Sequence, residues 1–324
     1  MKNIRRVVLA TLLMAPAVLS LPGLASAQGQ PVSIIVPYSA GGSGDTIARM
    51  LAEGLKRHLG GRSVIVENRP GASGRIAMQA LKSAHMENSA VVLAFSGVLV
   101  NSILYPGTKD YDFKNDFVGV AQVGKVPAAL AVPVNHKAQN ITEFVSQHAG
   151  KDGVFTYGNI GQGSFTHLAG LRFATATKLE PNPIGYQGGA PMANDLMGGQ
   201  IESGIDTLGD FVERHNTKRL KVLGVFGRER SPLLPGVPTM AEQGVANVEA
   251  EIWLGFLASK KMKPEFNEQF QEAVRKTLED ADVKSKVTQL LEIDFQPSQQ
   301  FAQIMASDFS TWTPIVQAAG LVQK

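Results

Sequence analysis

The sequence contains no cysteine among its 324 residues. Disulfide bonds, thiolate nucleophiles and cysteine metal sites are therefore excluded. The six histidines are scattered, and no pair has the H-E-x-x-H or H-x-x-x-H spacing that places two imidazoles on one face of a helix. We therefore expect no metal site, and the stability of the chain has to come from a hydrophobic core.

Long apolar runs are also scarce. A transmembrane helix needs about 20 apolar residues, whereas the run at 7–21 is shorter and is interrupted by Pro16. Three cations, Lys2, Arg5 and Arg6, precede or begin this run, and Ala25-Ser26-Ala27 follows it as a small-residue cleavage signal. This order is typical of a secretory signal peptide. We expect residues 1–27 to be removed and the mature chain to lie in the periplasm; the arginine pair leaves the general secretory and twin-arginine export routes open.

The chain has little net charge once this segment is set aside. The precursor carries 31 Lys and Arg against 28 Asp and Glu, a formal charge of +3. Three of the cations and none of the anions lie in residues 1–27, which leaves 28 of each sign in the mature chain. No basic block or zinc spacing follows, so we expect no nucleic-acid partner.

Apolar residues follow two periodicities along the chain. Short β-branched runs such as 33–36 predict buried strands, and apolar spacings of three and four, as in 45–59, predict helices with one apolar face. Strands are expected at 33–36, 64–66, 91–95, 117–123, 128–134, 154–157, 183–186, 201–205 and 220–226. Helices are expected at 45–59, 75–82, 141–148, 165–177, 191–197 and 265–279, with further helical segments to about Ala318. This alternation implies an α/β fold of mostly parallel sheets flanked by helices.

The mature length exceeds the size at which a single core stops growing, so two lobes are expected. Apolar runs without a strong break near 125–135 and 247–258 suggest two crossings between them. We expect one lobe from 28–127 plus 250–324 and the other from 128–249, with a ligand cleft between them. A monomer is the default expectation.

A glycine-rich turn, Pro37–Thr46, lies between the first strand and the first helix. The first N–H groups of a helix lack intrahelical partners and the helix dipole is positive there, so such a turn can bind an anion without Lys or Arg. The turn lacks the lysine of a P-loop, and Ile47 replaces the last glycine of a dinucleotide fingerprint. We therefore expect no cofactor. The alternative is a tight turn with Ser43 or Asp45 as the helix cap.

Residues 157–167 repeat this design: a strand, a turn with three glycines, and a helix start that carries hydroxyl groups. A second helix N-terminus in the other lobe is what a cleft that binds an anion would use. His167, three residues into the helix, is more typical of a capping or packing residue than of a catalytic one. The G-x-S-x-G nucleophile elbow is absent.

The sequence contains pairs of acidic residues that look like solvated charges. One acidic residue stands out from them. Asp206 directly follows the expected strand 201–205, at a strand end that would face the cleft. Capping of the following helix is an equally good explanation of this residue.

With these segments in place, the sequence resembles the extracytoplasmic receptors of tripartite tricarboxylate transporters, the Bug-type receptors. The resemblance extends over nearly all of the mature chain and is carried by motifs that occur in the same order. They are residues 35–42 with Asp45, Ala48 and Arg49; 66–74 (VENRPGASG); 157–170 in part; 186–191 (YQGGAP); 195–200 (DLMGGQ); 230–232 (RSP); and 234–239 (LPGVPT). The stretches 67–74 and 230–239 together are a specific signal.

The resemblance implies a two-lobed clamshell fold that holds one carboxylate through backbone amides of the two glycine loops. Carried over residue by residue, it implies ligand contacts at Tyr38, Ala40, Gly42, Ser43, Asp45, Ser96, Gly163, Ser164, Thr166, Tyr186 and Asp206. Asp206 would meet the variable end of the ligand, where it could accept from an amine or a hydroxyl group. The chain departs from the family at Ser96-Gly97-Val98, where an apolar residue stands in place of a common hydroxyl, and in the lysine-rich stretch 258–264.

Our hypothesis is a periplasmic solute-binding protein that captures a small carboxylate by lobe closure, delivers it to the permease subunits of a tripartite transporter, and catalyses nothing. The resemblance implies a carboxylate from a range that includes dicarboxylates and tricarboxylates, aromatic acids and acidic amino acids. A receptor that delivers to a signalling sensor is one alternative. An α/β hydrolase-type enzyme is another, which the missing nucleophile motif disfavours.

Overall fold

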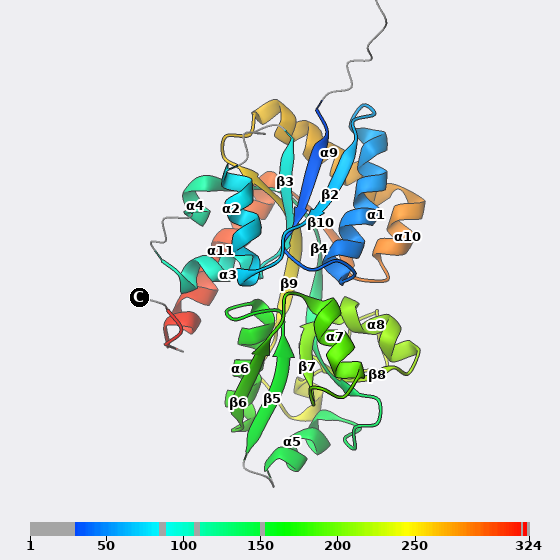
Figure 1. Cartoon of the computed structure of the whole chain (residues 1–324), viewed down its shortest axis with the longest axis vertical. Coiled ribbons are helices and arrows are strands. Elements are labelled where there is room, and N and C mark those ends of the chain that lie inside the picture. The colour runs from blue at the N-terminus through cyan, green and yellow to red at the C-terminus, as the bar shows by residue number, and fades with distance from the viewer. Residues whose placement is uncertain (1–29, 84–88, 107–110, 150–152, 319, 323–324) are drawn as a thin grey trace, which may run out of the picture.

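The computed structural model describes residues 30–83, 89–106, 111–149, 153–318 and 320–322. The expected signal peptide, 1–27, lies outside the described residues. The described chain is elongated and divides into an upper and a lower half, as oriented in Figure 1. Two strands, β4 (Phe117–Pro133) and β9 (Glu251–Ser259), run between the halves.

The upper half is built on a mixed sheet. Its strand order is β2 (Val64–Asn68), β1 (Val32–Val36), β3 (Ala90–Phe95), β9 and β4, with β10 (Glu292–Pro297) paired to β4. The helices around this sheet are α1 (Ser43–His58), α2 (Arg75–Ser83), α3 (Gly97–Leu104), α4 (Phe113–Asp116), α9 (Pro264–Glu279), α10 (Ala281–Val287) and α11 (Ser298–Ala318), with a short 3-10 turn η1 (Ala72–Gly74) before α2.

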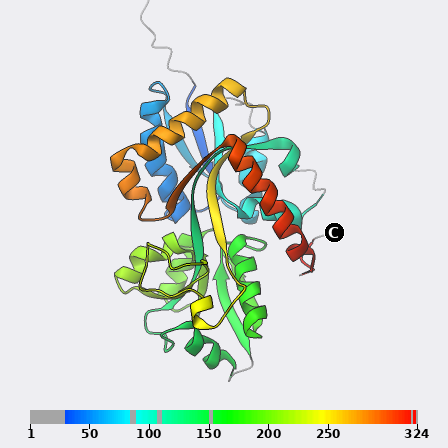
Figure 2. The same ribbon diagram turned by 180° about the vertical axis from the view of Figure 1, so that it is seen from behind.

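The lower half repeats the plan on a smaller sheet. The second part of β4 pairs with β7 (Gly204–Thr207) and β8 (Leu220–Val225). On its other side β7 pairs with β5 (Val154–Asn159), which in turn pairs with β6 (Glu180–Gly185). Its helices are α5 (Ile141–Ala149), α6 (Phe165–Thr177), α7 (Gly189–Met197) and α8 (Leu208–Asn216), with a 3-10 turn η2 (Ala241–Gln243). Figure 2 shows β4 and β9 side by side from behind.

The prediction of an α/β fold with helices flanking the sheets is confirmed, but the expectation of mostly parallel sheets is wrong. The pairs β1–β2, β1–β3, β5–β6 and β5–β7 are parallel. By contrast, β9 pairs antiparallel with both β3 and β4, and β4 pairs antiparallel with β7, β8 and β10. The strand β9 was not predicted, because its apolar run was interpreted only as a crossing.

Two further boundaries differ from the prediction. The strands expected at 117–123 and 128–134 are one continuous strand of 17 residues, β4, since β9 pairs with it across the interval between them. The strand expected at 201–205 is shifted to Gly204–Thr207, so Asp206 lies within β7 rather than after it. Local apolar patterning could not determine either feature, because both depend on a partner strand that is distant in the sequence.

The core follows the predicted apolar faces. The helix expected at 265–279 is α9, and its apolar residues at intervals of four, Phe266, Phe270, Val274 and Leu278, are buried. Where elements approach most closely, glycine replaces a side chain. A Cβ built on Gly124 of β4 would overlap the side chain of Leu291 and the backbone carbonyl of Glu292.

We therefore expect Gly124→Ala to lower the free energy of unfolding by about 1–3 kcal/mol, because the backbone at the start of β10 has to move away from β4. Urea denaturation measures this change. Gly236→Ala is the matched control, since a Cβ at Gly236 meets no atom within 4 Å. Equal stability of the two variants would contradict the prediction.

Candidate functional site

Helix N-termini gather where the two halves meet. The parallel strands β1 and β3 end at the junction and lead into α1 and α3, while β5, β6 and β7 end there from below and lead into α6, α7 and α8. The carboxyl ends of parallel strands are where α/β proteins bind ligands. The first N–H groups of each helix have no intrahelical partner, so this topology directs unpaired N–H groups towards the junction from both halves.

Asp45, in the first turn of α1, secures the first glycine loop. Its carboxylate accepts from the backbone N–H of Gly41 (2.9 Å) and from Asn68 of β2 (2.9 Å), and it forms an ion pair with Arg49 (2.9 Å). Although burial acts to raise the pKa of Asp45, these hydrogen bonds, led by that of Arg49, hold it below its usual value. The contacts of Asp45 thus lie within the upper half.

The backbone N–H and the hydroxyl of Ser43 form hydrogen bonds with residues of the lower half. Its backbone N–H donates to Oδ1 of Asp210 in α8 (2.8 Å), and its hydroxyl donates to Oδ2 of the same carboxylate. Thr207 Oγ1 also donates to Asp210 Oδ2 (2.9 Å) and lies 3.1 Å from the Ser43 hydroxyl. All three residues are buried. A carboxylate of the protein itself therefore occupies the N-terminus of α1.

Asp206 lies next to this group and is 2% exposed. Its Oδ1 accepts from the Thr207 N–H (2.7 Å), whereas its Oδ2 has no hydrogen-bond partner in the described part of the chain. A Cβ on Gly189, the first residue of α7, would overlap that oxygen. Burial, and then the nearby Asp210 carboxylate, raise the pKa of Asp206 well above its usual value.

In the second glycine loop, side chains at the start of α6 accept hydrogen bonds from backbone N–H groups of the same segment. Ser164 caps α6 by accepting from the His167 N–H (3.2 Å), and Thr166 Oγ1 accepts from the Ile160 N–H (3.2 Å). Nδ1 of His167 accepts from the Gly163 N–H (3.0 Å), so the neutral imidazole carries its proton on Nε2. Within the described residues, the N–H groups of Phe165 and Thr166 have no acceptor.

The start of α3 faces this loop from the upper half. A Cβ on Gly97 would lie 3.2 Å from the backbone nitrogen of Phe165 and 4.0 Å from Ser164 Cα. Ser96, directly before α3, is 2% exposed and its backbone N–H donates to Trp253 of β9 (3.1 Å). Tyr38 packs beside these groups, with its ring 5.6 Å from that of Phe95.

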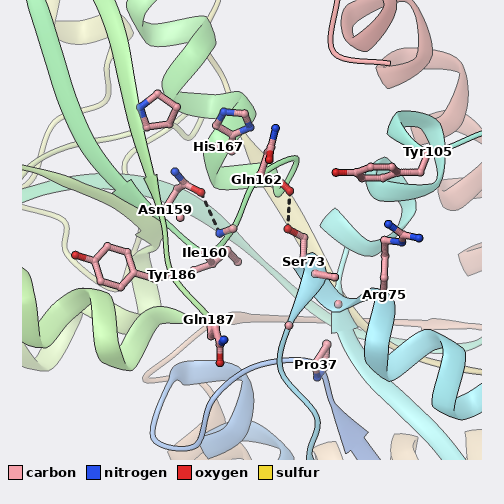
Figure 3. A pocket seen from close by; sticks show the side chains of 16 residues that line it. Pro37, Ser73, Arg75, Tyr105, Asn159, Ile160, Gln162, His167, Tyr186 and Gln187 are labelled. Carbon is pink, nitrogen blue, oxygen red and sulfur yellow. Dashed lines mark hydrogen bonds between the residues drawn. The ribbon is translucent and has the colours of Figure 1, made fainter. Parts of the chain in front are cut away.

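Three hydrogen bonds from two serines outside the buried cluster also connect the halves. The Ser73 hydroxyl donates to the backbone carbonyl of Gln162 (2.5 Å), and Ser39 donates to the Gln187 carbonyl from both its N–H (3.0 Å) and its hydroxyl (2.8 Å). The first of these appears in Figure 3. Both donors belong to the upper half and both acceptors are backbone carbonyls of the lower half.

A cavity of about 540 Å³ adjoins these contacts and is lined from both halves (Figure 3). Pro37, Ser73, Arg75 and Tyr105 line it from the upper half. The guanidinium group of Arg75 stacks over the Tyr105 ring at 4.5 Å. The lower half contributes a polar wall that includes Asn159, Gln162, His167, Tyr186 and Gln187. This volume lies within the range of small-molecule sites.

The structure thus brings most of the expected residues to one junction. Ser43 and Asp206 meet around Asp210, while Gly163, Ser164 and Thr166 form the start of α6 opposite Ser96. Tyr186 lines the cavity and donates to Asp195 (2.9 Å). Ala40 is exposed, and Gly42 directly precedes α1. The ligand contacts assigned to these residues stay predictions.

Several residues of this region were not predicted from the sequence. Asp210 follows Asp206 by four residues and lies in α8, but sequence spacing alone does not indicate that it bonds to Ser43, which is 167 residues away. Ser73 lies within the motif 66–74 and Arg75 directly follows it, and that motif was used only to support the resemblance. The serine between glycines in this motif is the signal that could have found the loop, and Gly74 adopts a positive φ (92°).

Comparisons with known proteins agree with this architecture. Residues 47–321 match the sequence profile described as "Tripartite tricarboxylate transporter family receptor". The chain belongs to this family. The protein BugT of Bordetella pertussis is 29% identical over 298 residues, which cover 90% of this chain and 90% of BugT.

Solved structures of relatives share the fold. The periplasmic binding protein BugD superposes with a TM-score of 0.84 at 27% identity, over 91% of this chain and 99% of BugD. A structure of an R. palustris protein with adipate gives a TM-score of 0.84 at 26% identity, over 90% of this chain and 97% of that one. The predicted two-lobed periplasmic-binding-protein fold is confirmed, and the family is one of solute receptors.

Two other kinds of site are absent from the described residues. In the described ranges, no group of three His, Cys, Asp or Glu side chains is placed to hold a metal ion. None of the helices in that part of the chain combines the length and hydropathy that a bilayer span requires.

His167 provides a pH test of the second loop. Burial lowers the pKa of His167 below 6.5, so the folded chain keeps it neutral while the unfolded chain takes up a proton below about pH 6.5. Its contribution to stability is therefore present above that pH and decreases as the pH falls towards the folded-state pKa. We expect His167→Asn, which keeps an acceptor but does not titrate, to be more destabilising at about pH 7.5 than at about pH 5. Urea denaturation at both values measures this difference, and a pH-independent difference would contradict it.

Proposed function

We propose that this protein is a periplasmic receptor that captures a small carboxylate between its two halves, releases it unchanged, and delivers it to the membrane subunits of a tripartite transporter. The observation that carries the proposal is the convergence of helix N-termini from both halves at one buried junction. There the N–H groups of Phe165 and Thr166 lack acceptors within the described residues. Such N–H groups bind carboxylates without a charged side chain.

We propose the two halves as the lobes of a clamshell, residues 28–127 with 250–324 and residues 128–249. The pairing of β4 supports this division: Pro127 pairs with Glu251 of β9, whereas the next residue, Ala128, pairs with Thr207 of β7. A ligand that contacts both lobes binds the closed arrangement better than the open one, and this difference in affinity drives closure.

Family membership and the adipate-bound relative support a carboxylate as the ligand. The mixed polar and aromatic walls of the cavity favour a small polar molecule over a long aliphatic one. The ligand contacts proposed are those predicted from the resemblance, with Asp45 acting by holding the first glycine loop in place through Gly41 and Asn68.

A panel of small carboxylates should raise the thermal unfolding temperature of the purified protein. A ligand at about 100 times its dissociation constant stabilises the folded state by about 2.7 kcal/mol, which corresponds to several degrees for a chain of this size. The amide of the same acid is the matched control and should give no shift, because it lacks the negative charge that the N–H groups bind. A panel without any shift, repeated after unfolding and refolding to remove bound ligand, would refute carboxylate binding.

The second glycine loop should control affinity. Thr166→Val removes the hydroxyl that accepts from Ile160 N–H and lies 3.1 Å from Ser164 Oγ, so the loop that presents the N–H groups loses its support. We expect binding of the acid that gives a thermal shift to weaken about ten-fold, or about 1.4 kcal/mol, by calorimetry. Thr175→Val, an exposed change on the same helix, is the control. Unchanged affinity in both variants would exclude this loop from the site.

A further inference from the structure

The N-terminus of α1 already holds an anion. The Asp210 carboxylate accepts both the first N–H of α1 and the hydroxyl of Ser43, and it is 5% exposed. Its third donor is Thr207 Oγ1. The position where the sequence predicts a ligand carboxylate is therefore filled by a side chain from the opposite half.

The same end of the junction holds a second acid with an unsatisfied oxygen. Asp206 Oδ2 is buried and has no partner in the described chain, and it lies against the N-terminal glycine of α7. Arg214, whose charge acts on Asp206, donates to the backbone carbonyl of Asp210 (2.5 Å). A buried oxygen without a hydrogen bond is costly, and a ligand group that donates a hydrogen bond to it would remove that cost.

The α6 end of the junction is different. There Ser164 and Thr166 surround N–H groups without acceptors in the described residues, and Gly97 of α3 packs closely against Phe165 N. One end of the junction thus offers donors to an anion, whereas the other presents acidic side chains.

We propose that Asp210 occupies one of the two anion sites of the cleft, so that the receptor selects a monocarboxylate with a hydroxyl or amino group at its other end rather than a dicarboxylate. This inference rests on the proposed carboxylate-binding function. The ligand carboxylate binds the N–H groups of α6, and its hydroxyl or amino group donates to Asp206. A second carboxylate at that end would meet the negative charge of Asp210, which already accepts from the first N–H of α1 and from the Ser43 hydroxyl, and this repulsion disfavours its binding.

Matched pairs of ligands test this selectivity by calorimetry. Succinate, glutarate and adipate are compared with γ-hydroxybutyrate, δ-hydroxyvalerate and ε-hydroxycaproate, and with the corresponding amino acids. We expect the best hydroxy or amino acid to bind at least about ten-fold more tightly than the dicarboxylate of equal length. A dicarboxylate that binds as tightly as its partners would overturn the inference while leaving the proposed function intact. A chain that binds none of these acids would overturn both.

Asp210→Asn then tests the cause. This change keeps the size of the side chain and removes its charge, so we expect the affinity for the dicarboxylate to rise about ten-fold relative to the hydroxy acid. Glu213→Gln removes an exposed charge from the same helix and should leave the ratio unchanged. An unchanged ratio in Asp210→Asn would overturn the role of Asp210.

Arg75→Gln tests the other location for the ligand. If the protein prefers dicarboxylates and Arg75→Gln loses that preference, the ligand extends into the cavity beside Tyr105 instead, which also overturns the inference. The comparison of ligands on the unaltered chain needs no variant to fold.

Discussion

The hydrogen bonds between the Asp210 carboxylate and the N-terminus of α1 define the junction on which the rest of the site depends. They join an acid of the lower half to the first N–H and the first hydroxyl of a helix in the upper half. The interaction is favourable because the N–H groups of a helix start lack internal partners and the helix dipole is positive there. It also holds the first glycine loop against α7 and α8, which positions Tyr38, Gly42 and Asp206 around the same point.

The contrast between the two glycine loops follows from this interaction. Both have the same local design, a strand that ends in glycines and is followed by a helix with hydroxyl residues. In the first loop, Asp45 and Asp210 satisfy the N–H groups of Gly41 and Ser43. In the second loop, the side chains of Ser164, Thr166 and His167 satisfy the amides of the loop and leave those of Phe165 and Thr166 available. The first N–H of the helix is therefore already bound in one segment and has no acceptor within the described residues in the other, although the two sequences share one design.

Much of the fold could be predicted from the sequence, because the information that specifies each helix is local. The helix α6 was predicted with the residues that the structure gives, and the apolar stripe of α9 is buried as expected. The errors concern β4, β7, β9 and β10, the last of which lies in a stretch expected to be helical. The length and direction of these strands depend on pairing with segments far away in the chain. For the site, the sequence indicated both glycine loops and Asp206, but not Asp210, Ser73 or Arg75.

The sequence by itself determined the composition of the junction: helix starts rich in glycine and hydroxyl groups, an absence of cysteine, and strands that alternate with helices. These features follow from spacing and residue type, which act over a few residues. Only the tertiary structure decided which N–H groups are already bound. That outcome depends on whether an acid such as Asp210 reaches a helix start 167 residues away, a question of packing geometry that no local pattern encodes.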